Sequence, residues 1–174
     1  VVHLLGYSHH DYYELPVAPS PNLQTLASVY LYPSLCLFEG TDVSVGRGTD
    51  LPFEVLGKPG FPEGNYDFTP KSIKGKSENP PYKGEVCHGF LLTRFADDYL
   101  KISKELYIFW LIAFYEKSTD KTKFFTPFFD KLAGNAELRK QIEEGKSIEE
   151  IKASWKPGLD AFKEVRKKYL LYAE

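Results

Sequence analysis

Residues 16–49 have the sequence PVAPSPNLQTLASVYLYPSLCLFEGTDVSVGRGT, which combines features that a hydrophobic core alone does not require. Three prolines fix the dihedral angle φ and favour extended geometry in the residues before them, which predicts a stiff approach that ends at Asn22. These prolines are Pro16, Pro19 and Pro21. Residues 23–37 are almost all apolar, so they predict a buried segment, kinked at Pro33, that ends close to Glu39.

The end of this stretch, GRGT at residues 46–49, places an arginine between two glycines. Glycine adopts positive φ without strain and lets a ligand approach the backbone, and the guanidinium of Arg47 matches a carboxylate or a phosphate. We therefore expect an anion-binding turn. An ordinary β-turn whose arginine pairs with Asp42 or Asp50 remains an equally good interpretation, because four residues are weak evidence alone.

Three motifs in this order and spacing, PSPN at 19–22, YPSLCLFEGT at 32–41 and SVGRGT at 44–49, resemble the bacterial exo-β-N-acetylmuramidase (NamZ-type) family, formerly a domain of unknown function. The similarity continues to the end of the chain. The later motifs are NPP at 79–81, GEVCHG at 84–89, FFDKLAG at 128–134, IEEG at 142–145, Trp155 and RKKYLLY at 166–172. Family members are roughly twice as long, so the resemblance implies that this chain is their C-terminal half.

The resemblance also implies two regions. Residues 1–15 are expected to be the end of a missing Rossmann-like N-terminal domain, and residues 16–174 to be a C-terminal α+β domain. The chain opens on VVHLL, a strand-like run with neither a methionine nor a signal sequence before it, which supports truncation. Natural processing at Val1 is the alternative.

Composition limits the classes of partner. The 174 residues are 43% hydrophobic and 16% aromatic, enough for one globular domain. A net charge of −2 from 22 basic and 24 acidic residues, without a basic stripe, argues against nucleic acid. The longest apolar run, residues 106–115, is shorter than the about 20 residues of a transmembrane helix.

The two cysteines, Cys36 and Cys87, lie far apart and form no CxxC motif, so neither zinc nor dithiol chemistry is expected. One disulfide and two buried thiols both remain open. We expect no metal and no cofactor.

The pattern along the chain predicts an α+β fold, with a strand- and loop-rich N-terminal part followed by a helical C-terminal part. Up to residue 95 we expect strands and loops, with strands near 52–56 and 86–92. Between them, residues 58–83 are rich in glycine, proline and lysine, and form either a loop across a cleft or a surface excursion.

From residue 96 onward helices are expected. Asp97 or Asp98 begins a core helix that reaches about Lys117. Asn135 caps a short helix that Gly145 ends, and Ser147 with Glu150 forms a capping box. A last helix starts at Pro157, with a buried stripe. The stripe consists of Leu159, Phe162, Val165 and Tyr169.

Glycoside hydrolysis commonly uses two carboxyl groups, one of them with a raised pKa. Glu39 is the candidate for this catalytic carboxyl group, because the apolar run before it would desolvate it. The alternative is a buried glutamate paired with Arg47. The resemblance implies that the principal acid lies in the missing half. In that family this half would line the cleft, and its substrate-binding residues would be Asn22, Asp42, Gly46, Arg47, Gly48 and Thr49.

Arg47 is the candidate contact for the lactyl carboxylate of N-acetylmuramic acid, while Asn22 and Asp42 would bond to hydroxyl or acetamido groups. Tyr30 or Tyr32 either stacks on a sugar or belongs to the core. His88 is more consistent with a hydrogen-bonded strand histidine than with an acid or base, and residues 9–10, both histidines, are a weak metal signal.

The expected function is removal of terminal β-linked N-acetylmuramic acid from the non-reducing ends of peptidoglycan fragments, in the bacterial cell envelope, periplasmic or secreted. Its partners would be peptidoglycan-derived saccharides and the missing N-terminal half. Two alternatives remain open: a non-catalytic peptidoglycan- or carbohydrate-binding module, and a structural half-domain with an exposed apolar face.

Overall fold

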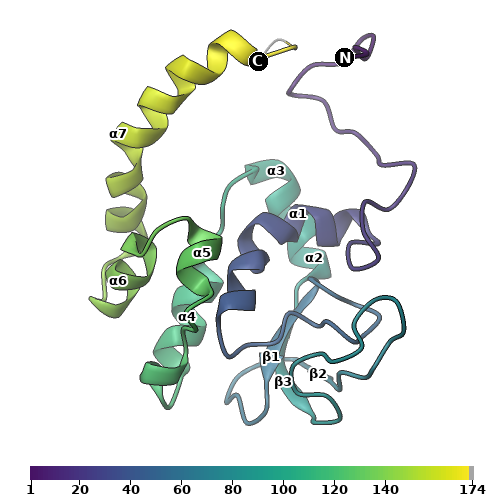
Figure 1. Ribbon diagram of the computed structural model, residues 1–174, viewed down its shortest axis with the longest axis vertical. Coiled ribbons are helices and arrows are strands. Elements are labelled where there is room, and N and C mark those ends of the chain that lie inside the picture. The colour runs from purple at the N-terminus through teal and green to yellow at the C-terminus, as the bar shows by residue number, and fades with distance from the viewer. Residues whose placement is uncertain (173–174) are drawn as a thin grey trace.

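The computed structural model, which describes residues 1–172, places a small antiparallel sheet at one end of the molecule, with helices beside and above it (Figure 1). The strands are β1 (Val55–Lys58), β2 (Tyr66–Phe68) and β3 (Cys87–Leu91), and β3 lies in the middle. Leu56 is paired with Phe90, and Tyr66 with Gly89. Both expected strands are present, and β2 lies within the expected loop, so the fold is consistent with an α+β domain.

The first half also contains a helix, α1 (Leu26–Leu35), followed by the 3-10 turn η1 (Cys36–Gly40). Thr25 and Ser28 form a capping box at its start, and Leu31 and Leu35 are fully buried. The prediction that residues 23–37 are buried is confirmed only in part, because Gln24, Thr25, Tyr32 and Pro33 are exposed. The expectation of strands and loops is wrong here. A helix buried on most sides shows little hydrophobic periodicity, and Pro33 within it obscured the pattern.

The single helix expected over residues 97–117 is divided in two. The first part consists of α2 (Thr93–Phe95), a π-helical turn η2 (Ala96–Leu100) and α3 (Lys101–Ser103), and the second is α4 (Phe109–Lys117). Lys104 adopts the left-handed conformation, with φ of 49°, and ends the first part. Asp97 and Asp98 lie inside η2 and cap nothing, so that prediction is wrong.

The local signals predicted at Asn135, Gly145 and Ser147 are present. The elements are η3 (Lys121–Lys123), α5 (Phe129–Ala133), α6 (Glu137–Glu143), α7 (Ile148–Arg166) and η4 (Lys167–Tyr169). Asn135 Oδ1 accepts a hydrogen bond from Glu137 N, and Gly145 follows α6 with φ of 73°. Ser147 and Glu150 form the expected capping box.

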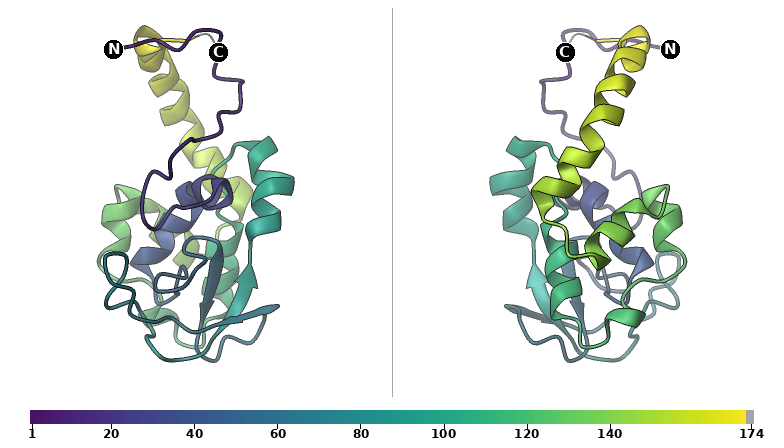
Figure 2. Two further views of the ribbon diagram at one scale, coloured as in Figure 1. Left: turned by 90° about the vertical axis from the view of Figure 1, so that its right-hand side faces the viewer. Right: turned by 90° about the vertical axis from the view of Figure 1, so that its left-hand side faces the viewer.

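Helix α7 runs through Pro157, so the last helix does not start there, and its far half extends away from the rest of the molecule (Figures 1 and 2). Ile151, in its first turns, is fully buried. The stripe predicted to be buried is at least half exposed, so this part of the helix contributes no buried side chain to the core among residues 1–172. The exposed fractions are Leu159 51%, Phe162 60%, Val165 50% and Tyr169 75%.

The N-terminal segment is irregular, and no strand forms at residues 1–5, where Val1, Val2 and Leu5 are more than nine-tenths exposed. The expected terminal strand is therefore absent from the described chain. This segment instead approaches the C-terminal end, as Figure 2 shows. Leu4 N donates to Tyr172 Oη at 2.9 Å.

The core joins the sheet to α1, α4, α5 and the start of α7. Its largest fully buried side chains include Phe38, Phe53, Phe114, Phe124, Phe129 and Ile151. Cys36 and Cys87 are both free thiols, which excludes the disulfide. No helix among residues 1–172 is long and apolar enough to span a bilayer.

Candidate functional site

The turn η1 and the glycine-flanked turn bring Glu39 and Arg47 into contact. Arg47 Nε lies 2.6 Å from Glu39 Oε1, and the two side chains are 31% and 23% exposed. Arg47 therefore pairs with Glu39 and not with Asp42 or Asp50, the partners expected in an ordinary β-turn. This contact matches the interpretation of Glu39 as an arginine-paired glutamate.

Arg47 also lies over an aromatic ring, that of Phe53, at 5.0 Å from guanidinium carbon to ring centroid. The ring of Tyr32 contacts the same phenylalanine edge to face, with the centroids 5.0 Å apart. Phe53 is 1% exposed and adopts φ of 60°, an uncommon conformation for a bulky residue that the surroundings must hold in place. We call Tyr32, Glu39, Arg47 and Phe53 the Arg47 patch.

The glycines beside Arg47 serve the packing of the chain itself. Gly46 and Gly48 have φ of 76° and 83°, and a Cβ atom on Gly46 would lie 2.4 Å from Val55 Cγ2. On Gly48 it would lie 2.5 Å from Pro80 Cγ. Atoms of the protein therefore occupy the space that we expected a ligand to use at these two glycines. Thr49 Oγ1 donates to Gly46 O at 2.6 Å, which closes the turn.

Asp42 lies in a different set of contacts. Its Oδ2 is 2.7 Å from Lys58 Nζ, which also donates to Ser118 Oγ at 3.2 Å. Its backbone carbonyl accepts a bond from the Tyr82 hydroxyl, and burial, followed by the charge of Asp42, raises the pKa of Tyr82 to about 12. Asp42 Oδ1 is buried with no hydrogen-bond partner among residues 1–172. These contacts tie the loop to β1.

Asn22 is held by the loop that precedes β3, because its Nδ2 donates to Lys76 O at 3.3 Å. Its contacts and those of Asp42 involve no member of the Arg47 patch. Tyr30 is partly buried against the core, whereas Tyr32 is 39% exposed. Of these two candidate tyrosines, Tyr32 therefore has the more exposed ring.

The candidate histidines lie in β3 and in the N-terminal segment. His88 Nδ1 is hydrogen-bonded to Asp67 Oδ1 across β2 and β3, as expected of a strand histidine with a partner. His9 and His10 lie in the exposed N-terminal segment. Among residues 1–172, no group of three or more histidine, cysteine, aspartate or glutamate side chains is arranged to hold a metal ion.

Glu54 is a buried carboxylate that sequence reasoning missed. It is 2% exposed, and the hydroxyls of Thr25 and Thr93 donate to its two oxygens. A glutamate inside the apolar run at 52–56 was the available signal. It links the start of α1 to the start of α2 and lies directly after Phe53 in the sequence.

These features define an α+β domain whose polar surface site is an oriented arginine beside a carboxylate and an aromatic ring. A family profile described as "Exo-beta-N-acetylmuramidase NamZ, C-terminal" matches residues 30–172. The chain belongs to this family, which confirms the resemblance found in its motifs.

Two relatives support this membership. The chain is 36% identical over 168 residues to the peptidoglycan β-N-acetylmuramidase NamZ of Bacillus subtilis, in a match that covers 90% of this chain and 40% of that protein. It is 48% identical, with a TM-score of 0.91, to a crystal structure of a DUF1343 family protein from Bacteroides fragilis, over 98% of this chain and 48% of the other. The chain thus spans less than half the length of either relative.

Proposed function

We propose that this chain is the C-terminal portion of a glycoside hydrolase that removes terminal β-linked N-acetylmuramic acid from the non-reducing ends of peptidoglycan fragments. Its family membership and the name of the Bacillus subtilis relative support this proposal. The enzyme would act in the bacterial cell envelope, periplasmic or secreted, where such fragments arise, and an N-terminal portion would complete it.

The observation that carries the proposal is the geometry of Arg47. N-acetylmuramic acid differs from N-acetylglucosamine by a lactyl ether that bears a carboxylate. Glu39 engages only Nε of Arg47, and the two terminal nitrogens have no hydrogen-bond partner among residues 1–172. They can therefore hold a carboxylate end-on, with two parallel bonds. Because Glu39 and Phe53 already orient the guanidinium, little further ordering is needed on binding.

In this proposal Glu39 positions Arg47. Its Oε1 accepts the bond from Nε, so the carboxylate is committed to the arginine. The two carboxyl groups that glycoside hydrolysis commonly uses then come from the longer protein. Tyr32 offers an exposed ring beside the patch for the face of the sugar.

The test uses the longer protein of which we propose this chain is a part, with chromogenic β-N-acetylmuramide and β-N-acetylglucosaminide substrates. Wild type should cleave the first in preference. Arg47→Ala should lower kcat/KM for the muramide by roughly ten- to a hundredfold, the loss expected for a charge-assisted hydrogen bond. Arg94→Ala, which removes an arginine with a 95% exposed side chain, is the matched control. Equal cleavage of both substrates by wild type would refute the assignment.

A non-catalytic binding module is the second candidate, because Tyr32 and Arg47 are both accessible on this chain alone. Titration of the 174-residue chain with N-acetylmuramic acid separates the two candidates. A module should bind the sugar without any further domain, whereas one wall of a shared cleft should bind it only weakly.

A further inference from the structure

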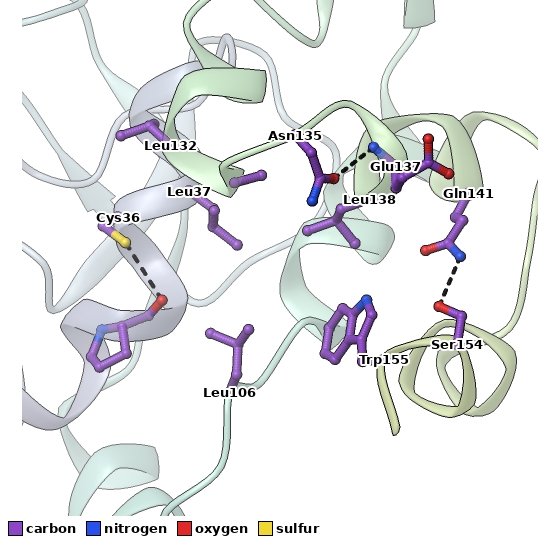
Figure 3. A pocket seen from close by; sticks show the side chains of 12 residues that line it. Cys36, Leu37, Leu106, Leu132, Asn135, Glu137, Leu138, Gln141, Ser154 and Trp155 are labelled. Atoms are coloured by element: carbon purple, nitrogen blue, oxygen red, sulfur yellow. Dashed lines mark hydrogen bonds between the residues drawn. The ribbon is translucent and has the colours of Figure 1, made fainter. Parts of the chain in front are cut away.

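A cavity of about 600 Å³ lies between η1, α6 and α7, and neither Glu39 nor Arg47 lines it (Figure 3). Its wall is mostly apolar, and Leu37, Leu106 and Leu138 contribute to it together with the indole of Trp155. This volume is in the range of small-molecule sites, which are typically apolar with a few placed polar groups. Two side-chain amides supply such groups here.

The first amide belongs to Gln141, which is 7% exposed. Its Nε2 donates to Ser154 Oγ at 2.9 Å, and the Ser154 hydroxyl donates to Ile151 O at 2.7 Å. Because the hydroxyl proton is used in that bond, Ser154 Oγ can only accept from Gln141, and this fixes the orientation of the amide. Gln141 Oε1 is therefore the free end. It is buried with no partner among residues 1–172, and it points into the cavity in Figure 3.

The second amide belongs to Asn135, at the start of α6. Its Oδ1 accepts the bond from Glu137 N at 2.9 Å, so its Nδ2 is the free end and points toward Leu138 in Figure 3. The two amides thus present an acceptor and a donor, beside the indole N–H of Trp155, on a largely apolar wall. An unpartnered buried carbonyl costs free energy that a ligand's N–H group would recover.

We propose that this cavity is a second ligand site, which binds the acetamido group of an N-acetylated amino sugar. The N–H of the acetamido group donates to Gln141 Oε1, and its carbonyl accepts from Asn135 Nδ2. Its methyl group lies among the leucines, and the apolar face of the sugar ring packs on Trp155.

Three features favour a sugar over a peptide, which also carries secondary amides. The cavity has the volume of a site for a compact ligand, its two amides offer an acceptor and a donor to a single acetamido group, and it includes a broad aromatic face. A peptide would require further partners along an extended groove. Arg47 does not line this cavity, so binding there does not require it. N-acetylglucosamine carries the acetamido group but no lactyl carboxylate, so it tests this cavity separately from Arg47.

The experiment is a titration of the ¹⁵N-labelled 174-residue chain with N-acetylglucosamine, monitored by NMR at the side-chain amides of Asn135 and Gln141 and at the indole N–H of Trp155. We expect saturable shifts at these three groups. Glucose, which has no acetamido group, should shift them much less. Equal responses to the two sugars, or no response to either, would overturn the proposal.

Variants test the two polar contacts separately. Asn135→Asp keeps the oxygen that accepts from Glu137 N but replaces the donor, so it should weaken binding roughly tenfold while the fold is retained. Gln141→Leu should weaken binding at least as much, and Lys140→Ala, on the exposed side of the same helix, should leave it unchanged.

If Asn135→Asp is folded and binds N-acetylglucosamine as well as wild type does, the proposed donor is wrong. Binding of a peptide in place of the sugar is tested with N-acetylalanine N-methylamide, which carries two secondary amides but no sugar ring. Tighter binding of that compound than of the sugar would overturn the assignment to an amino sugar.

Discussion

The bond between Arg47 Nε and Glu39 Oε1 determines what each side chain can contribute to a substrate site. The carboxylate orients the guanidinium, and the guanidinium offers its outer nitrogens. The guanidinium also lies over the ring of Phe53, a residue with positive φ. Each of these residues lies near the others only because two turns meet, so the patch depends on backbone conformation as much as on residue type.

This geometry predicts the effect of Glu39→Gln in the longer protein. Glutamine keeps an oxygen that accepts from Arg47 Nε, so the guanidinium stays oriented and kcat/KM for a β-N-acetylmuramide should fall by no more than about tenfold. Loss of a general acid would lower it by roughly a hundred- to ten-thousandfold. Steady-state kinetics distinguishes a positioning role from that of a general acid. A fall of the larger size in kcat/KM would support Glu39 as the catalytic acid.

Asp130 gives a second prediction at this scale, which concerns pH. Arg139 binds it with two parallel bonds of 2.9 Å, and these bonds lower the pKa of Asp130 below its usual value of 3.8. A carboxylate with a lowered pKa in the folded state stabilises the fold above pH 3.8, and this contribution is lost as the pH falls through the folded pKa.

The corresponding variant is Asp130→Asn. Urea unfolding should show wild type as the more stable protein at pH 7, with the difference shrinking below pH 3.8. Asp98→Asn, with a side chain that is 73% exposed, is the control and should show little difference at either pH. A difference for Asp130→Asn that is constant with pH would show that ionisation has no part in it.

Among the elements, those with local signals were predictable and those that depend on distant contacts were not. The capping box at Ser147 and the cap at Asn135 are each determined within four residues, and both were found in the sequence. Helix α1 was missed because burial on most sides removes the amphipathic pattern. The helix expected over 97–117 is interrupted at Lys104, which adopts a left-handed conformation that no local sequence signal predicts.

The same limit applies to the candidate site. The turn around Arg47 was recognisable from its two glycines, and Glu39 was recognisable as a lone carboxylate after an apolar run. Their mutual contact was one of several options, and it depends on how η1 meets the turn. Glu54 was missed because its partners, Thr25 and Thr93, are remote in sequence and carry no motif.

Two glycines in different elements give a paired prediction. A Cβ atom on Gly89, in the middle strand, would lie 1.9 Å from Leu56 O, so Gly89→Ala must push β1 away and should destabilise the fold by about 1–3 kcal/mol or more. Gly158, in α7, has no atom within 4 Å of such a Cβ. Gly158→Ala should therefore stabilise the fold by about 0.5–1 kcal/mol. Urea unfolding measures both, and a stabilised Gly89→Ala would contradict the observed strand spacing.

At the scale of the whole molecule, the far half of α7 and the N-terminal segment stand apart from the core, as both views in Figure 2 show. The spacing of Leu159, Phe162, Val165 and Tyr169 predicts a core-facing stripe, yet the stripe is exposed in this chain. Both relatives extend over more than twice the length matched here. We therefore expect the stripe to face the remainder of the longer protein.

This expectation predicts that Phe162→Gln with Val165→Gln affects the two lengths of protein differently. In the 174-residue chain both side chains are at least half exposed, so the free energy of unfolding should change little, whereas Ile151→Gln, at a fully buried position of the same helix, should unfold it. In the longer protein the double variant should lose about 2 kcal/mol or more, because a buried large apolar side chain contributes roughly 1.5–3 kcal/mol. Urea unfolding of both lengths measures the difference, and an unaffected longer protein would show that the stripe stays in solvent there as well.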